Sequence, residues 1–186
     1  MAELKTGGVP AVREAYLTEL VLERLTGAPA PSYQSQAMLT GIEREPEARA
    51  AYAFEHNVDV VECGFLEHPQ IANAGASPDG LIWPDGLVEL KCPNDATHLD
   101  TLLKPDKIAQ KYIYQMMFQM AVTGRAWCDF VSYSPNFPEP MRLSVARVMR
   151  SAPMVARLEI QAVRFLVEVD VTVEQLLEKY PMQEAA

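Results

Sequence analysis

The chain has 186 residues, 49% of them apolar, and a formal net charge of −9. This length suits one compact domain with a sizeable core, so we predict a single domain over residues 1–186. The acidic total argues against non-specific coating of DNA. No apolar run approaches the roughly 20 residues that span a bilayer, and the N-terminus has no apolar signal core, so we expect a soluble, cytoplasmic protein.

The first part of the chain predicts two helices and then short strands. "VREAYLTELVLERLTG" carries apolar side chains at helical spacing and ends at Gly27, a common helix stop. "GIEREPEARAAYAFEHN", residues 41–57, predicts a second helix that is interrupted or restarted near Pro46. The β-branched segment 58–68 predicts a strand, and "PQIANAGAS" continues into a second short one.

The segment "DGLIWPDGLVELKC" predicts a β-hairpin, because two apolar runs flank Pro, Asp and Gly, the residues that tight turns favour. A turn centred just after Asp85 would place Glu89 opposite Ile82. Asp79 would then lie at the Lys91 end of the hairpin, whereas Asp85 would form the turn itself. We therefore predict that Asp79, the more distant aspartate in sequence, is the one that reaches Glu89.

The second strand of this hairpin carries a charged face. Side chains alternate along a strand, so Glu89 and Lys91 project from one face while their apolar neighbours point to the other. Carboxylates such as Asp79 and Glu89 are the ligands that Mg²⁺ prefers, and an ammonium can orient a water and offset charge on a phosphate. The alternative is a surface hairpin whose Glu and Lys pair with neighbours.

The rest of the chain completes a mixed α/β pattern. A helix follows the hairpin and contains Gln115. "RAWCDFVSYS" and "PMRLSVARVMR" predict two strands around a Pro-rich loop. Residues 153–180 predict a long terminal helix that restarts after "VEVDVT". Strands and helices in this order predict a sheet with helices on its faces.

The charge is unevenly distributed along the chain. Residues 1–90 hold 5 basic and 14 acidic residues, whereas residues 91–186 hold 11 of each. Four lysines follow the hairpin, at positions 91, 104, 107 and 111. They can contact DNA phosphates within a narrow channel, or the last three can be a solvated helix face.

These motifs together resemble the lambda-type phage exonucleases, the YqaJ-like viral recombinases of the PD-(D/E)xK nuclease superfamily. The matching segments agree in order and spacing, and they run from about residue 10 to about residue 170: "ERLTG", "GIEREPEAR", "ASPDGL", "VELKCP" and "YIYQMMFQMAVTGRAWCDFVSY". The resemblance implies a restriction-endonuclease-like α/β core in which a mixed sheet is flanked by helices.

The resemblance also implies roles for individual residues. Asp79, Glu89 and the backbone carbonyl of Leu90 would bind Mg²⁺, with Mn²⁺ as a substitute, and Lys91 would orient the attacking water. Three further side chains would complete the site: Ser77 near the scissile phosphate, Gln115 on the nucleophile side, and Glu45 near the metal and its waters.

The activity implied is 5′ to 3′ digestion of linear double-stranded DNA, which leaves 3′ single-stranded overhangs for recombination. A homotrimeric ring and a phage single-strand annealing protein are implied as partners, in a protein encoded by a phage or prophage. The upstream Arg segment that helps these exonucleases to bind the 5′-phosphate has no counterpart that we can match, so hydrolysis is predicted more firmly than 5′ specificity. Two alternatives stay open: an endonuclease or repair nuclease of the same fold, and a non-cleaving DNA-binding or assembly protein.

Overall fold

The computed structural model describes residues 11–30 and 35–181. The chain divides into two compact units, one within Gln34–Glu159 and the other within Met1–Tyr33 and Ile160–Ala186. The larger unit contains every residue predicted for the site. The single-domain organisation stays a prediction. In the part of the chain described, no helix is both long and apolar enough to cross a membrane.

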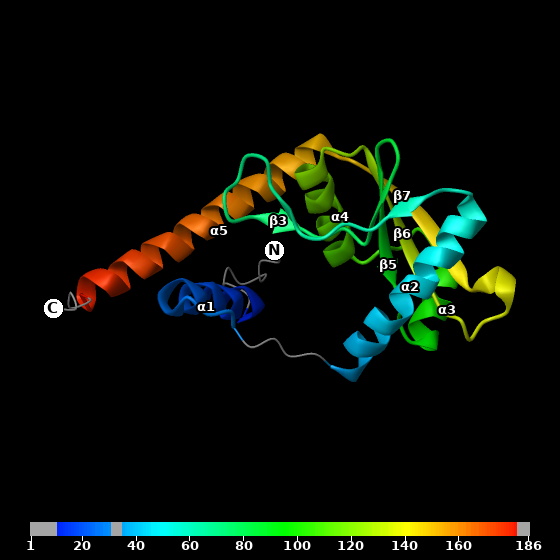
Figure 1. Cartoon of the computed structure of the whole chain (residues 1–186), viewed down its shortest axis with the longest axis horizontal. Coiled ribbons are helices and arrows are strands. Elements are labelled where there is room, and N and C mark those ends of the chain that lie inside the picture. The colour runs from blue at the N-terminus through cyan, green and yellow to red at the C-terminus, as the bar shows by residue number, and fades with distance from the viewer. Residues whose placement is uncertain (1–10, 31–34, 182–186) are drawn as a thin grey trace. The chain divides into compact units, whose positions relative to one another are not determined.

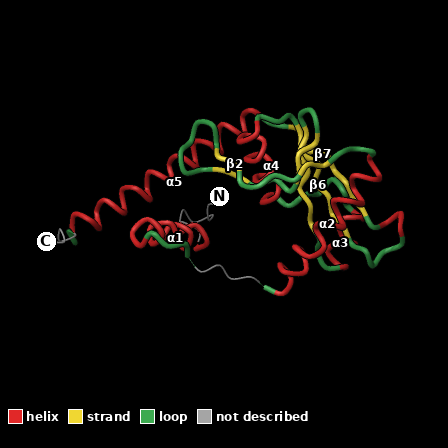
Figure 2. The backbone as a smooth tube through the Cα atoms, in the orientation of Figure 1, coloured by secondary structure: helices red, strands yellow, loops and turns green. Residues whose placement is uncertain are grey.

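A five-stranded sheet forms the centre of the larger unit, and its strands are drawn in yellow in Figure 2. In spatial order the strands are β1 (Val60–Val61), β4 (Gly80–Ile82), β5 (Gly86–Lys91), β6 (Trp127–Tyr133) and β7 (Leu143–Met149). Strands β5 and β6 are parallel and the other pairs are antiparallel. A parallel pair needs a crossover connection, and here it consists of α3 (Asp95–Leu103) and α4 (Gln110–Thr123). The remaining short elements are β2 (Leu66–Glu67), β3 (Gly75–Ala76) and the 3₁₀ turn η1 (Glu139–Met141).

Helices cover both faces of this sheet (Figure 1). On one face, Tyr52 of α2 (Gln36–His56) packs against Val88 and Leu90 of β5. On the other face, the methionines of α4 pack against Leu87. Alternation along β5 therefore divides its side chains between two buried clusters. The predicted mixed α/β sheet flanked by helices is confirmed.

Three predicted elements differ from the structure. Helix α2 continues through Pro46 without a break, although proline has no N–H and leaves one carbonyl of the preceding turn without its helical partner. The strand predicted over residues 58–68 is reduced to β1 and β2, two residues each. The terminal helix α5 (Ala152–Lys179) does not restart after "VEVDVT", because helical packing outweighs the β-preference of its valines.

The hairpin of β4 and β5 forms as predicted, but in a different register. Gly86 pairs with Ile82, so the turn consists of residues 83–85, and the predicted pairing of Glu89 with Ile82 is wrong. Arg125 fixes both ends of the turn, because its Nη1 donates to the carbonyls of Ile82 at 2.6 Å and Gly86 at 2.8 Å. A Cβ on residue 86 would collide with the ring of Trp127, so this position requires glycine. Continued by one residue beyond Gly80 and Val88, the observed register places Asp79 directly beside Glu89.

The smaller unit pairs α1 (Ala11–Thr26) with the C-terminal part of α5. Val21 of α1 is buried with Phe165 and Val169 of α5. Arg13 of α1 also forms an ion pair with Glu168 of α5. Of the apolar stripe expected on the first helix, Leu20 packs in this cluster and Tyr16 stacks on Phe165, whereas Val12 and Leu25 are exposed.

Candidate active site

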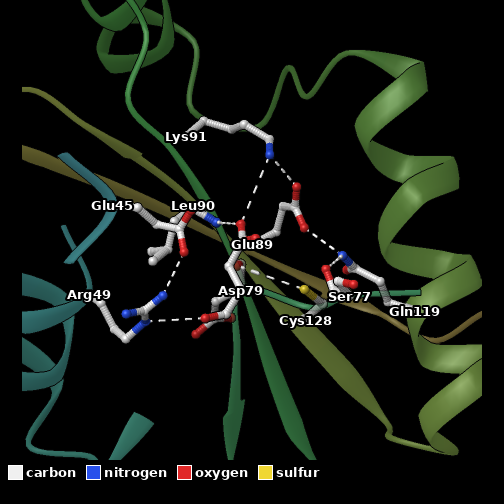
Figure 3. A network of polar contacts seen from close by, with 10 residues as sticks. Glu45, Arg49, Ser77, Asp79, Glu89, Leu90, Lys91, Gln119 and Cys128 are labelled. Carbon is white, nitrogen blue, oxygen red and sulfur yellow. Dashed lines mark hydrogen bonds and ion pairs between the residues drawn. The ribbon is translucent and has the colours of Figure 1, made fainter. Parts of the chain in front are cut away.

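Glu89 is the most deeply buried charged residue of the site. Its side chain is 0% exposed, and its carboxylate has one partner on each oxygen (Figure 3). Oε1 forms an ion pair with Nζ of Lys91, and Oε2 accepts a hydrogen bond of 2.6 Å from Nε2 of Gln119. A buried carboxylate is costly unless it is paired, and these two contacts supply that pairing.

Asp79 lies just before β4, and its carboxylate is anchored to β5. The backbone N–H of Leu90 donates to Oδ2 of Asp79 at 2.7 Å. Burial, together with the neighbouring charge of Glu89, raises the pKa of Asp79 to about 7. Lys91 and the bond from Leu90 act in the opposite direction but do not cancel this effect. The protein thus holds two carboxylates closer together than their charges favour.

Lys91 lies between the two carboxylates. Its Nζ contacts Oε1 of Glu89 and is 4.0 Å from Oδ2 of Asp79. Burial alone would lower the pKa of Lys91, but these two carboxylates outweigh it and the pKa is raised. The ammonium also lies over the ring of Tyr112, 5.5 Å from its centroid. The predicted grouping of Asp79, Glu89 and Lys91 is present in the structure.

Helix α2 contributes an acidic residue and an arginine that fixes it (Figure 3). Nη2 of Arg49 is 2.6 Å from Oε1 of Glu45, one turn earlier on the helix. The same guanidinium donates from Nε to the backbone carbonyl of Asp79 at 3.2 Å, and its Nη1 pairs with Glu62. Glu45 therefore lies at the site as predicted. Arg49 had no predicted role, although the i, i+4 spacing from Glu45 is a signal for such a pair.

A glutamine for which no role was predicted, Gln119, contacts Glu89. Gln115 is exposed on α4, whereas Gln119, one turn later, is buried and contacts Glu89. Residues four apart on a helix share a face, so the sequence alone did not separate them. Ser77 is exposed, and its backbone carbonyl lies 3.5 Å from Nε2 of Gln119. The side chain of Ser77 makes no hydrogen bond with another described residue that would assign it a role.

The oxygen atoms of this site fit a hard divalent cation. Oε1 of buried Glu89 has no hydrogen bond of good geometry and only the ion pair with Lys91, so it can accept a further positive partner. The backbone N–H and C=O of one strand residue lie on the same edge of the strand, so the carbonyl of Leu90 lies on the edge of β5 at which its N–H donates to Asp79. In the described ranges, no group of three or more His, Cys, Asp or Glu residues could hold a metal. Two carboxylates and a carbonyl nevertheless match Mg²⁺, which usually keeps several waters.

A pocket of about 390 Å³ opens beside these groups. Asp79 and Glu45 line it from two different elements, and Lys91 and Tyr112 form part of its wall. Cys92 also lines it, and burial raises the pKa of this thiol to about 11, so it is not a thiolate near neutral pH. The pocket gives an external group access to Asp79 and Lys91, whereas Glu89 is not among the residues that line it.

The chain is similar to known viral recombinases and exonucleases. A family model, the YqaJ-like viral recombinase domain, matches residues 11–126. The structure of LHK-Exo, an alkaline exonuclease from Laribacter hongkongensis, is 44% identical, with a TM-score of 0.86 over 92% of this chain and 87% of that one. LHK-Exo in complex with dAMP gives 45% identity and a TM-score of 0.86, over 91% of this chain and 86% of that one.

A third structure shows the same fold at low identity. It is a phage-related exonuclease from Haemophilus somnus 129PT, 15% identical, with a TM-score of 0.69 over 96% of this chain and 91% of that one. No curated protein matches the chain.

Proposed function

The chain belongs to the YqaJ-like viral recombinase family, and on this premise we propose that it is a metal-dependent exonuclease that hydrolyses the phosphodiester bonds of linear double-stranded DNA. The observation that carries the proposal is the position of Lys91, whose ammonium contacts the carboxylates of both Asp79 and Glu89 at the edge of an open pocket. The similarity to LHK-Exo, solved with dAMP, supports a deoxynucleotide substrate.

In the proposed reaction, each residue of the site has a distinct task. Asp79, Glu89 and the carbonyl of Leu90 would hold Mg²⁺ or Mn²⁺. When bound, such an ion polarises a phosphoryl oxygen and lowers the pKa of a bound water. Lys91 holds the attacking water by a hydrogen bond, and its positive charge stabilises the negative charge that develops on the phosphate. Gln119 holds the Glu89 carboxylate in place without adding charge.

Glu45 and Arg49 have supporting tasks in this proposal. Glu45 faces the same pocket as Asp79 and can hold waters around the cation. Arg49 donates hydrogen bonds to both the Glu45 carboxylate and the backbone carbonyl of Asp79, and so holds the two residues at a fixed distance from each other. Arg49 is therefore a positioning residue, because it acts through these two neighbours.

The direction of digestion and the biological role are part of the proposal. We propose digestion from 5′ to 3′, which leaves 3′ single-stranded ends for a phage annealing protein. A homotrimer that encircles the DNA would reconcile the net charge of −9 with a substrate that is itself acidic. The direction is measured with two substrates, one labelled at the 5′ end and one at the 3′ end. Digestion from 5′ to 3′ releases the 5′ label first.

Linear and covalently closed circular DNA of the same sequence separate this function from its main alternative. With Mg²⁺, we expect the linear DNA to be degraded and the circle to stay intact. Equal cutting of both would indicate an endonuclease of the same fold and would contradict the proposal. Linear DNA with 5′-phosphate or 5′-hydroxyl ends, digested in parallel, shows whether the end group contributes to recognition.

A further inference from the structure

A second pocket lies next to the candidate active site, between α3 and α4. Its volume is about 250 Å³. It shares three lining residues, Lys91, Pro93 and Tyr112, with the pocket that contains Asp79. The two pockets therefore meet at Lys91, and a group bound in one is adjacent to a group bound in the other.

The charged residues that line this second pocket are mostly basic. Lys91, Lys104 and Lys107 contribute three positive charges, against one negative charge from Asp100. Lys91 is already engaged by the carboxylates of the site. Across residues 11–30 and 35–181, no ion pair involves Lys104 or Lys107. Two lysines that have no acidic partner in the described structure thus face a pocket beside the site, and this arrangement favours an anion.

The backbone brings these two lysines together. The N–H of Lys107 donates to the carbonyl of Lys104 at 3.0 Å, which closes a four-residue turn with Pro105 and Asp106 at its centre. The Cα atoms at the two ends of such a turn lie within about 7 Å of each other. Both ammonium groups therefore start from one short, hydrogen-bonded segment of backbone. Ala109, which precedes α4, also lines the pocket, so the positive end of the α4 dipole contributes in the same sense.

We propose that this pocket is a second phosphate subsite, in which Lys104 and Lys107 bind a phosphate of the substrate strand next to the scissile phosphate. The inference rests on the proposed nuclease function and extends its site along the DNA strand. A solvated helix face would account for lysines that point into open water. Lys104 and Lys107 are exposed, but both also line a pocket that shares three residues with the one beside Asp79.

Binding of duplex DNA in EDTA, followed by fluorescence anisotropy, tests the subsite without cleavage. Lys104→Gln together with Lys107→Gln should weaken binding on the order of 10-fold and lower the slope of log Kd against log salt concentration by about one. The matched control is Arg164→Gln together with Lys179→Gln, which removes the same charge from exposed basic residues outside the pocket. The control should change binding by less than about 2-fold.

The end group of the DNA identifies which phosphate is bound. A loss limited to 5′-phosphorylated ends supports a terminal phosphate in the subsite, and an equal loss with 5′-hydroxyl ends supports an internal one. Unchanged binding by the Lys104/Lys107 variant, or an equal loss in the control variant, overturns the subsite. If the parent protein degrades DNA and the Lys104/Lys107 variant binds DNA as tightly as the parent, the subsite fails while the nuclease function stands. A parent that neither binds nor degrades DNA contradicts the nuclease function itself.

Discussion

Gln119 donates a hydrogen bond of 2.6 Å to Oε2 of Glu89, and both side chains are almost completely buried. This contact connects α4 to β5 at the centre of the candidate site. It also leaves Oε1 of Glu89 directed to Lys91. The orientation of the central carboxylate thus depends on a helix that approaches from one face of the sheet.

Gln119→Met should lower the rate of DNA hydrolysis about 10- to 100-fold, which is typical when a residue that orients a metal ligand is lost. Methionine is similar in size but cannot donate the hydrogen bond to Glu89. Gln115→Met is the matched control, because Gln115 is exposed on the same helix. Initial rates of nucleotide release, with melting temperatures to confirm folding, measure both variants. If the two variants lose activity equally, the role assigned to Gln119 is wrong.

Arg49→Ala should lower activity about 10-fold and raise the Mn²⁺ concentration that gives half-maximal activity. The reason is that Glu45 and the backbone of Asp79 lose their common donor. Arg49→Lys should recover only part of the loss, because an ammonium cannot reproduce the guanidinium fork. A merely structural role predicts a lower melting temperature with an unchanged Mn²⁺ requirement. Glu62→Gln is the control, because Glu62 is an exposed partner of the same arginine outside the site.

Asp79→Asn should stabilise the metal-free protein at pH 8. The pKa of Asp79 is raised from its ordinary value of 3.8 to about 7, so between these values the folded chain binds more protons than the unfolded chain. Stability therefore falls as pH rises from about 4 to about 7, and the asparagine variant avoids this loss. We expect its free energy of unfolding in EDTA to exceed the parent's by roughly 1 to 4 kcal/mol at pH 8, and by much less at pH 4.

Chemical denaturation at the two pH values measures this difference. Asp85→Asn, in the exposed turn, is the control and should show no such dependence on pH. Saturating Mn²⁺ should stabilise the parent more than Asp79→Asn, because only the parent retains both carboxylates. If Asp79→Asn is no more stable than the parent at pH 8 in EDTA, the crowded pair of carboxylates is not a feature of the folded protein.

The polar face of the hairpin could be predicted because strand alternation is a local property. Glu89 and Lys91 are two residues apart, so any strand at this position places them together. The pairing register could not be derived in the same way, because "WPDG" permits more than one turn and only the contacts of Arg125 and Trp127 fix it. Asp79 rather than Asp85 nevertheless reaches Glu89 and Lys91, since the turn contains Asp85 under either register.

Tertiary contacts decided the features that the sequence left open. Gln115 and Gln119 share a helical face, and only the packing of α4 on the sheet shows which one reaches Glu89. Arg49 carries a local signal through its i, i+4 spacing from Glu45, but its bond to the backbone of Asp79 joins residues 30 apart. Local patterns thus predicted which residues form the site, and packing determined how they contact one another.

Release of acid-soluble nucleotides from linear duplex DNA in Mg²⁺, by the parent and by Lys91→Ala, tests the central claim most directly. We expect release by the parent and a rate at least about 100-fold lower for Lys91→Ala, since a preorganised charge at the reacting phosphate is lost. Lys179→Gln, far from this site in sequence and exposed, should match the parent. Equal release by the parent and Lys91→Ala would contradict the assignment of Asp79, Glu89 and Lys91 as the site of hydrolysis.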